Sequence, residues 1–461
     1  MTGNSFREFI ACLEKTAQLT VVDKQVDPLW EVGSYLWKHE HKIPPKAVLF
    51  NKVKGFSIPV VGGLYSTWGR IALALNVGDE HFNACKMRDL WFKAIDNPLK
   101  PINVSDGPVK EVVYERGEAD LRTLPIPTLF KEDGGPYITA GIGVSKNPLT
   151  HAYNFGIYRM QVIDKDKIHV WGSPVSDLAE IYDWHRKRKS SMDFAVAVGV
   201  DPSILFTAVA KIPENVDAWD VAGSLKGEPI KLVRGQTTDI PVPAEAEIVI
   251  EGEIDPANES NEGPFAEFGG FYKGGVVPIM QVKAITRRND SCFHTVISGP
   301  SYEHWTLTEQ GFAPFWSKNI LDHLREEGYD NVLDVNIFWR WVMQWIVISI
   351  DKRSDAEPLE VIEKTLECDA SAYHMPPVKK WSRFIIVVDS DVDIHRFEEV
   401  VWALTTYTTD PAKLALYPDV ASWGFEAAFM QDGKTLRIGV DATKPLAMSG
   451  RLLRTRTVQL D

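Results

Sequence analysis

The chain has 461 residues, of which 44% are hydrophobic and 25% charged, and its formal net charge is −13. This length predicts two or three domains with a large buried core. The acidic charge argues against a nucleic-acid partner or an anionic membrane surface, since both favour basic patches. The most apolar run, 341–350, is too short to cross a membrane, and the four scattered cysteines form no Cys-x-x-Cys pair. We therefore expect a cytoplasmic protein without a disulfide framework or a structural zinc site.

Residues 1–109 predict an N-terminal α/β domain. Ser5-x-x-Glu8 is a capping box, and the apolar residues around it recur at helical spacing, so we expect an initial helix. Further runs alternate between the two patterns, with strands expected at 19–22, 47–50 and 59–61 and helices at 70–75 and 82–95. A polar stretch with prolines, 97–108, ends this domain.

Residues 110–300 change to short β-runs separated by Gly, Pro and Asn. The clearest strands are expected at 137–144, 156–163, 167–171, 195–200, 246–250, 279–286 and 292–297. One helix is expected at 178–187. Many short strands with few helices favour a partly closed β-barrel over a parallel sheet.

A linker helix is expected within 301–330, and residues 331–461 predict a C-terminal α/β domain. Its strands are expected at 345–350 and 384–388, and its helices at 358–367 and 396–404. The whole chain is therefore predicted to be an α+β and α/β multidomain protein, in which α/β portions flank a central barrel.

The segment Glu262-Gly-Pro-Phe-Ala-Glu267 places two carboxylates five residues apart around a Gly-Pro bend. Such a sequence disfavours both helix and strand and predicts a loop with a restricted backbone. Two carboxylates held close together can differ in proton affinity, which suits general acid–base catalysis. The alternative interpretation is an acidic turn in water.

Arg159 lies in an alternating run, in which it shares one face with Ile157 and Gln161. A guanidinium between apolar neighbours either pairs with a buried carboxylate or binds an anionic ligand, and the alternative is an exposed arginine. With Glu262 and Glu267 as partners, Arg159 would hold a substrate carboxylate while one glutamate delivers a proton.

Asn154 precedes Arg159 by five residues, close enough for both side chains to enter one pocket. Its amide suits a hard metal ion or a cation bound to phosphate, and the alternative is a turn residue. The eleven histidines show no metal-binding spacing, and the sequence contains no Walker loop or dinucleotide-binding glycine motif.

Several segments together resemble the UbiD family of decarboxylases, which depend on prenylated FMN. The most specific are the blocks Asn-x-Gly-x-Tyr-Arg and Glu-Gly-Pro-Phe-x-Glu, which occur in this order about a hundred residues apart. The resemblance extends along nearly the whole chain, through Phe6-Arg-Glu-Phe-Ile10, Ala47-Val-Leu-Phe-Asn51, Ile138-Thr-Ala-Gly-Ile142, Asn154-Phe-Gly-Ile-Tyr-Arg-Met-Gln161, 243–252, 262–267 and Gly439-Val-Asp-Ala-Thr443.

The resemblance implies a flavin-reductase-like split β-barrel between the two α/β portions, of which the C-terminal one carries oligomerisation elements. It implies a reversible, non-oxidative decarboxylation or carboxylation of an aromatic or α,β-unsaturated acid, with prenylated FMN as a covalent electron sink. The implied partners are the acid, CO2, a flavin prenyltransferase that supplies the cofactor, and further copies of the chain in a homodimer or homohexamer. Aromatic residues beside the two blocks favour an aromatic acid.

By position, the resemblance assigns the catalytic roles to Arg159, Glu262 and Glu267. Arg159 would be the carboxylate clamp, and Glu267 would donate the proton that replaces CO2. The resemblance also implies that Asn154 is a ligand of the divalent metal that ties the cofactor phosphate to the protein. Cofactor contacts are implied for Thr139, Asn154, Ile157 and, near the phosphate, Arg437.

The metal itself, Mn or Mg with K as a further ion, is poorly supported by this sequence. Ala218 stands where the family has a glutamate ligand, and Val175 or Ser176 stands where it has a histidine. Asp177 and Asp217 lie next to these positions and would serve as ligands after a one-residue shift. Two of the three usual protein ligands are therefore missing.

Lys211 lies near the expected phosphate region, which leads to two hypotheses. In the first, Lys211 and Arg437 neutralise the phosphate in place of the metal. In the second, the chain is one subunit of a hetero-oligomeric carboxylase similar to phenylphosphate carboxylase. A non-catalytic scaffold subunit and a redox flavoprotein are the remaining alternatives, although a scaffold has no need for a buried charged trio.

Overall fold

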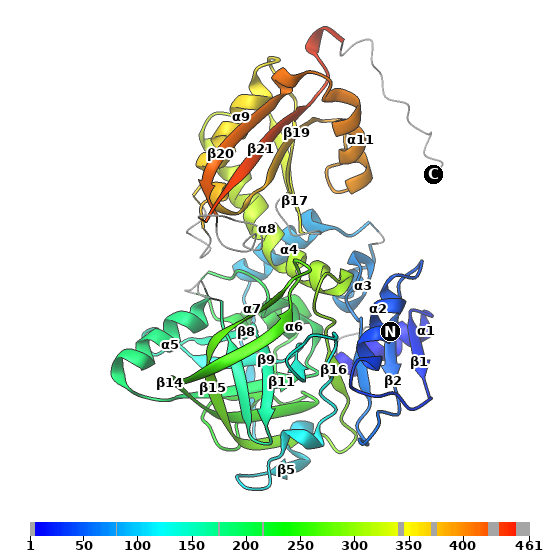
Figure 1. Cartoon of the computed structure of the whole chain (residues 1–461), viewed down its shortest axis with the longest axis vertical. Coiled ribbons are helices and arrows are strands. Elements are labelled where there is room, and N and C mark those ends of the chain that lie inside the picture. Colours follow the sequence, from blue (N-terminus) through cyan, green and yellow to red (C-terminus); the bar gives the residue numbers. More distant parts are fainter. Residues whose placement is uncertain are drawn as a thin grey trace. The chain divides into compact units, whose positions relative to one another are not determined.

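The computed structural model describes residues 5–79, 81–173, 176–213, 216–339, 345–369, 376–422 and 433–448. The chain divides into two compact units (Figure 1). Unit 1 comprises Met1–Phe82 and Asp89–Gly311, and unit 2 comprises Asn83–Arg88 and Phe312–Asp461. Within the described ranges, no helix is long and apolar enough to cross a membrane.

The first sheet of unit 1 has four strands in the order β1-β2-β3-β16. These strands and the helices of the same part of the chain are β1 (Leu19–Val22), β2 (Ala47–Phe50), β3 (Val60–Gly62), β16 (Phe293–Thr295), α1 (Phe6–Lys15), α2 (Glu31–Glu40), α3 (Trp68–Ala74) and α4 (Ala84–Asp96). The capping box is confirmed, because the side chain of Ser5 accepts a hydrogen bond from the Glu8 N–H. Although β16 follows the central sheet in the chain, it pairs with β3. Apart from residues 83–88, the predicted domains 1–109 and 110–300 thus share one compact unit.

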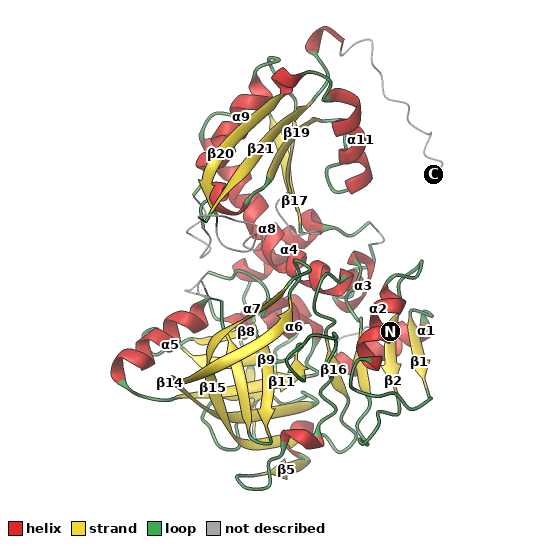
Figure 2. Ribbon diagram, viewed as in Figure 1, coloured by secondary structure: helices red, strands yellow, loops and turns green. Residues whose placement is uncertain are grey.

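The central sheet of unit 1 is antiparallel and has nine strands among the described residues. Eight follow the order β6-β9-β10-β15-β14-β11-β7-β8, and β5 pairs with β15. Their bounds are β5 (Val112–Tyr114), β6 (Tyr137–Ile138), β7 (Ile142–Lys146), β8 (Tyr153–Ile157), β9 (Arg159–Asp164), β10 (Lys167–Trp171), β11 (Met192–Val198), β14 (Ile248–Ala266) and β15 (Tyr272–Arg287). Figure 2 shows these strands curling around one another.

The sheet is open rather than closed, because its pairing path ends at β6 and β8. The run 156–163, expected as one strand, divides at Tyr158 into the end of β8 and the start of β9. Tyr158 joins β8, at one end of the path, to β9, which is next to β6 at the other end. The sheet therefore has to curl. The arrangement agrees with a split barrel and with the predicted multidomain α+β class.

β14 and β15 form the longest hairpin of the sheet (green in Figure 1). The expected loop at 262–267 is instead mostly the irregular end of β14, which pairs with β15 as far as Ala266. The prediction of a loop is wrong because cross-strand pairing continues past the bend. The pairing register shifts between Glu262 and Phe265, since Gly263 has a φ of +101° and Pro264 has no N–H to donate.

The remaining elements of unit 1 are short. They are α5 (Asp177–Arg188), α6 (Pro202–Thr207), α7 (Ala218–Lys226) and a three-stranded sheet of β13 (Pro241–Pro243), β12 (Lys231–Arg234) and β4 (Ile102–Val104). The expected linker helix is α8 (Tyr302–Glu326), whose residues up to Gly311 belong to unit 1 and the rest to unit 2.

Unit 2 contains a five-stranded sheet in the order β17-β18-β19-β21-β20. Its elements are β17 (Val332–Phe338), β18 (Trp345–Ile350), β19 (Phe384–Asp389), β20 (Leu414–Ala421), β21 (Lys434–Ala442), α9 (Glu357–Glu367), α10 (Val378–Trp381) and α11 (Phe397–Tyr407). The three middle strands are parallel, and both edge strands are antiparallel to their neighbours. Val347 and Ile386 of the sheet share a buried core with Val400 and Ala403 of α11, so this part of unit 2 has an α/β architecture.

Candidate active site

The structure brings together the three charged residues predicted to be catalytic. Arg159 begins β9, Glu262 lies near the end of β14, and Glu267 follows β14 directly. Nη2 of Arg159 donates a hydrogen bond of 2.7 Å to Oε2 of Glu262, and Nη1 donates to Oε1 of Glu267. One guanidinium therefore bridges both carboxylates through different nitrogens.

Little of this trio is accessible to water. The side chains of Arg159, Glu262 and Glu267 are 6%, 0% and 13% exposed. The rings of Trp171 and Phe265 cover the guanidinium, with centroids 4.5 and 5.3 Å from its central carbon. Because the aromatic rings exclude water, the charges interact in a medium of low dielectric constant.

The proton affinity of Glu262 is set by opposing effects. Burial raises its pKa, whereas the charge of Arg159 and hydrogen bonds from Tyr137 and Arg159 lower it, and the net direction is upward. The Tyr137 hydroxyl donates 2.8 Å to Oε1 of Glu262. Two ionised carboxylates around one guanidinium would leave an excess negative charge, and a proton on one of them removes it. This pair is therefore suited to holding and delivering a proton.

His304, near the start of α8, is a neighbour of the trio that was not predicted from the sequence. Its ring interacts electrostatically with Glu267 and meets the ring of Phe268 edge-on, with centroids 5.6 Å apart. Burial lowers the pKa of His304, and the charge of Glu267 opposes this shift. Nδ1 lies 3.2 Å from the carbonyl oxygen of Gly299, which can only accept, so Nδ1 carries a proton. No local motif marks this histidine.

The chain matches three family models along its length. Residues 10–84, 100–301 and 316–442 match, in turn, the N-terminal, Rift-related and C-terminal domains of 3-octaprenyl-4-hydroxybenzoate carboxy-lyase, UbiD. This chain belongs to the UbiD family. The resemblance, the multidomain fold and the assignment to the carboxy-lyases are thereby confirmed.

Several proteins of similar length share this architecture. Anhydromevalonate phosphate decarboxylase of Methanothermobacter thermautotrophicus is 29% identical over 448 residues, which cover 94% of this chain and 96% of that protein. The structure of the UbiD-class enzyme HmfF from Pelotomaculum thermopropionicum in complex with FMN is 30% identical, with a TM-score of 0.86 and coverage of 98% and 97%. Vanillic acid decarboxylase of Sedimentibacter hydroxybenzoicus (ShVdcCD) is 26% identical, with a TM-score of 0.85 and coverage of 99% and 95%.

Two positions that the UbiD resemblance assigns to the flavin lie close to Arg159 in the chain or in the sheet. Ile157 ends β8, two residues before Arg159, and is partly buried. Thr139 follows β6, and its Oγ1 lies 3.0 Å from Oγ1 of Thr295 and accepts the Val296 N–H at 3.1 Å. These bonds fix Thr139 against the segment after β16, and its contact with flavin stays a prediction.

A second polar group in unit 1 contains the residues expected at the cofactor phosphate. Nδ2 of Asn154 donates 3.1 Å to the hydroxyl of Tyr158. Burial raises the pKa of Tyr158, and the charge of Asp177 raises it further. Burial lowers the pKa of Lys211, and the same Asp177 opposes this. The charge of Asp177 thus acts on both Lys211 and Tyr158, and Asn154 is bonded to Tyr158.

The three-ligand metal site of the UbiD family does not fit the residues present here. Ala218 begins α7 and has no ligand atom. Ser176 caps α5 and Asp217 caps α7, each by accepting a backbone hydrogen bond. Val175 lies outside the described residues. Asn154 and the alternative ligand Asp177 remain in the described chain, and we assign no chemical step to a metal.

Arg437 lies in β21 of unit 2 and is fully buried. Its Nε donates 2.7 Å to the carbonyl of Lys379, and its Nη2 donates 2.8 Å to the carbonyl of Lys380. Backbone acceptors satisfy these buried donors without a phosphate. These contacts hold Arg437 within unit 2, and its contact with the cofactor phosphate stays a prediction.

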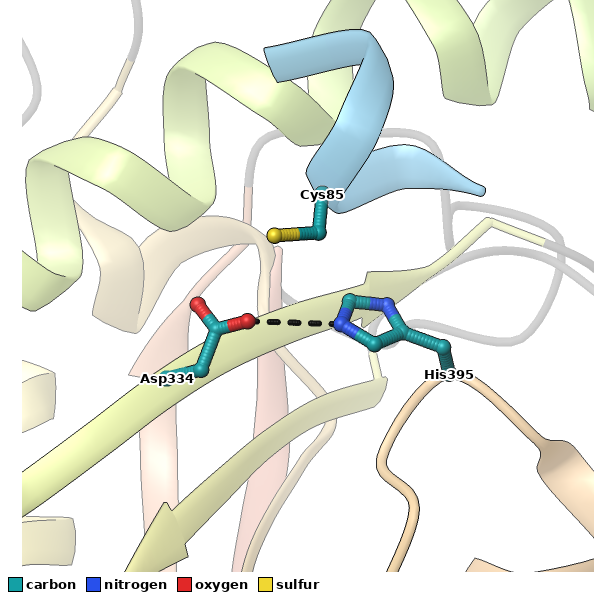
Figure 3. Close-up of side chains that lie close together, drawn as sticks. All are labelled: Cys85, Asp334 and His395. Atoms are coloured by element: carbon teal, nitrogen blue, oxygen red, sulfur yellow. Dashed lines mark hydrogen bonds and ion pairs between the residues drawn. The ribbon is translucent and has the colours of Figure 1, made fainter. Parts of the chain in front are cut away.

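Unit 2 contains a different cluster, formed by Cys85, Asp334 and His395 (Figure 3). Among the residues described, this is the group of three His, Cys, Asp or Glu side chains whose ligand atoms lie within 4.8 Å of one another. Nε2 of His395 lies 3.3 Å from Oδ2 of Asp334. Arg88 donates 2.9 Å to Oδ1 of Asp334 and 3.0 Å to Sγ of Cys85. A guanidinium bonded to two of the three groups already supplies positive charge, so we interpret this as an ion-pair cluster.

Proposed function

We propose that this chain decarboxylates an aromatic or α,β-unsaturated carboxylic acid, or carboxylates the product in reverse, with prenylated FMN as its cofactor. The observation that carries the proposal is the buried guanidinium of Arg159 between the carboxylates of Glu262 and Glu267. Two further findings support it: the full-length relatives are named decarboxylases, and HmfF has been solved with FMN and with prFMN.

The charges of the trio define what each residue does. When bound, prenylated FMN would serve as the electron sink for the carbon that loses CO2. Nε of Arg159 is buried and has no hydrogen-bond partner in the described chain, so it is the donor we assign to the substrate carboxylate. Holding the carboxylate there orients the breaking bond and excludes water from it.

The proton that replaces CO2 has to come from an acid beside the reacting carbon. We assign this role to Glu267, because its side chain is 13% exposed whereas that of Glu262 is fully buried. Glu262 accepts hydrogen bonds from both Arg159 and Tyr137, so it fixes the guanidinium that also contacts Glu267. After each turnover Glu267 regains a proton from the solvent.

Expression together with a flavin prenyltransferase tests the proposal. The purified chain should contain prenylated FMN by mass spectrometry and should release CO2 from at least one acid of a panel. The panel should span aromatic, α,β-unsaturated and phosphorylated unsaturated acids, the last because of the relative named above. A chain that carries prenylated FMN but releases CO2 from none of them would contradict the function. Bleaching of the flavin by a nicotinamide donor would instead favour a redox flavoprotein.

For the cofactor phosphate we propose Lys211 with Asn154, without a divalent metal. Burial lowers the pKa of the Lys211 ammonium, and a phosphate dianion beside it would offset this loss of solvation. Lys211→Ala should therefore lose flavin during purification, whereas Lys211→Arg should keep it and EDTA should not remove it. Unchanged flavin content in Lys211→Ala would overturn this assignment. So would a wild-type protein that contains Mn or Mg and loses its flavin when EDTA removes the metal.

A second candidate function is that of one subunit in a hetero-oligomeric decarboxylase. It is favoured by one observation, since the similar vanillic acid decarboxylase has also been solved with a truncated second component, ShVdcD. Activity of the chain purified alone, as a homodimer or homohexamer by light scattering, would exclude the need for a partner. A flavin-loaded but inactive chain that gains activity from its cell extract would support one.

A further inference from the structure

A second pair of side chains lies beside the Arg159 pair on strands β9 and β10. The register of these strands places Arg159 opposite Trp171 and Gln161 opposite His169. Residues two apart in a strand face the same side, so both pairs lie on one face of the sheet. Arg159 of the first pair contacts the catalytic carboxylates and Trp171 covers its guanidinium, whereas Gln161 and His169 have no part in the chemistry described above.

Gln161 joins the bend at Gly263 in β14 to the loop that contains Gly134. Its Oε1 accepts the N–H of Gly263 at 3.2 Å, and its Nε2 donates 2.9 Å to the carbonyl of Gly134. The Gly134 N–H in turn donates 2.7 Å to the carbonyl of Pro264. The two backbone segments at Gly134 and Gly263 approach so closely that a Cβ on Gly134 would lie 2.3 Å from the Gly263 oxygen. Gln161, which is 5% exposed, therefore holds the backbone between Glu262 and Glu267.

His169 fixes Gln161 in this orientation. Its Nδ1 lies 3.1 Å from Oε1 of Gln161, and its Nε2 lies 2.6 Å from Oγ of Ser260. Because Oε1 already accepts the Gly263 N–H, the amide presents an acceptor to the ring, and Nδ1 has to carry the proton. In the neutral ring Nε2 then accepts from the Ser260 hydroxyl. Burial lowers the pKa of His169, which favours this neutral form.

We propose that Gln161 and His169 are positioning residues, which hold the bend at Gly263 and thereby set Glu262 and Glu267 against Arg159. Hydrogen bonds run from Ser260 through His169 and Gln161 to Gly263. They attach the acidic segment, residues 262–267, to strands β9 and β10. The catalytic meaning of this positioning rests on the proposed function. The positioning itself does not, because it is a property of the protein without substrate.

Two substitutions of His169 separate the proposed contact from general packing. An Asn amide nitrogen can occupy the place of Nδ1, so His169→Asn keeps the donor to Gln161 and loses the contact with Ser260. A Gln amide reaches the place of Nε2, so His169→Gln keeps the Ser260 contact and loses the donor. Gln161→Leu removes the hydrogen bonds to Gly263 and Gly134 at nearly unchanged side-chain volume. If His169 contributed only general packing, His169→Asn and His169→Gln would change the exchange of residues 260–267 to the same extent.

Hydrogen–deuterium exchange of the purified, unliganded proteins tests the proposal. In His169→Gln and Gln161→Leu the peptides that cover 260–267 should exchange at least about tenfold faster, while peptides of β18 and β19 stay unchanged. His169→Asn should match the wild type. Equal exchange in His169→Asn and His169→Gln, or no change in either, would overturn the proposal. Because the two His169 variants differ by one methylene, the comparison does not depend on Gln161→Leu folding well.

Turnover then distinguishes this proposal from the proposed function. With any acid that the wild type decarboxylates, kcat should fall at least about tenfold in His169→Gln and at most about threefold in His169→Asn, with KM nearly unchanged. Faster exchange at 260–267 in an otherwise inactive protein would support the positioning role and count against the decarboxylase. A wild-type kcat in His169→Gln despite faster exchange would show that the bend does not set the catalytic geometry.

Discussion

Each unit contains an arginine held among acidic or titratable side chains, and the two clusters differ in their balance of charge. In unit 1, Arg159 bridges two glutamates and is covered by aromatic rings. In unit 2, Arg88 donates to the carboxylate of Asp334 and to the thiol of Cys85, and His395 lies 3.3 Å from the same carboxylate. Around Arg159 two carboxylates share one guanidinium, whereas the carboxylate of Asp334 is bonded by both Arg88 and His395.

The directions of the pKa shifts follow from this difference. Burial outweighs the single guanidinium and raises the pKa of Glu262. Burial also acts on Asp334, but its hydrogen bonds with His395 and Arg88 outweigh it and lower the pKa to about 2. A buried arginine is thus no sign of catalysis by itself. Burial of more than one carboxylate around it is what favours the protonated form of one of them.

The largest expected effect comes from Arg159→Lys. An ammonium cannot bridge two carboxylates and also bind substrate in a plane, so kcat/KM should fall by at least about 100-fold. The matched control is Arg88→Lys in unit 2, which should keep kcat/KM within about twofold. Steady-state kinetics on the flavin-loaded proteins measure both. Similar losses in the two variants would mean that general stability, not the bridge, explains the result.

A smaller effect is expected from Tyr137→Phe. The Tyr137 hydroxyl donates to Glu262 and lowers its pKa, so its loss should raise that pKa further. The limb of the kcat/KM profile that reports this acid should move to higher pH. A profile identical to that of the wild type would show that Glu262 does not titrate in the catalytic range.

The two acids should also give opposite pH dependence of stability. The pKa of Asp334 is lowered from 3.8 to about 2, so its contribution, about 2 kcal/mol, is present above pH 4 and is lost as the pH falls toward 2. Asp334→Asn should therefore lower the unfolding temperature at pH 7, and the deficit should shrink toward pH 3. Scanning calorimetry at several pH values measures this. A deficit that is constant with pH would contradict the ion-pair interpretation.

Glu262→Gln should behave in the reverse sense. Because the folded protein raises the pKa of Glu262, its ionisation costs stability as the pH rises from 4.5 through the folded value. Glutamine imitates the protonated acid, so the variant should gain relative to the wild type as the pH rises. The same calorimetric series provides the check, and a relative loss at higher pH would show that Glu262 is stabilised as an anion.

Local signals were enough to predict elements with strong patterns. β1, β2, β10 and β18 have the bounds expected from alternating or continuous apolar runs, and Ser5 caps α1 as its capping box predicts. α2 was not predicted, because it begins after Trp30, which makes no side-chain cap. The acidic segment was predicted as a loop, since its pairing partner β15 lies outside any local window.

The candidate site was predicted unevenly for the same reason. Arg159, Glu262 and Glu267 occur in two blocks specific enough to be found without coordinates. His304 and His169 carry no motif, because they contact partners about 40 and about 90 residues away in the chain. Arg437 differs from these residues. The UbiD resemblance assigns it to the cofactor phosphate, whereas in the structure it donates to the backbone carbonyls of Lys379 and Lys380.

The most direct test of the central claim is the rate of CO2 release by Glu267→Gln, loaded with prenylated FMN, relative to the wild type. Glutamine keeps the size of the side chain and still accepts a hydrogen bond from Arg159, but it has no proton to deliver. The proposed chemistry predicts a loss of kcat of at least about 100-fold with bound flavin unchanged. A variant that releases CO2 at the wild-type rate would contradict it.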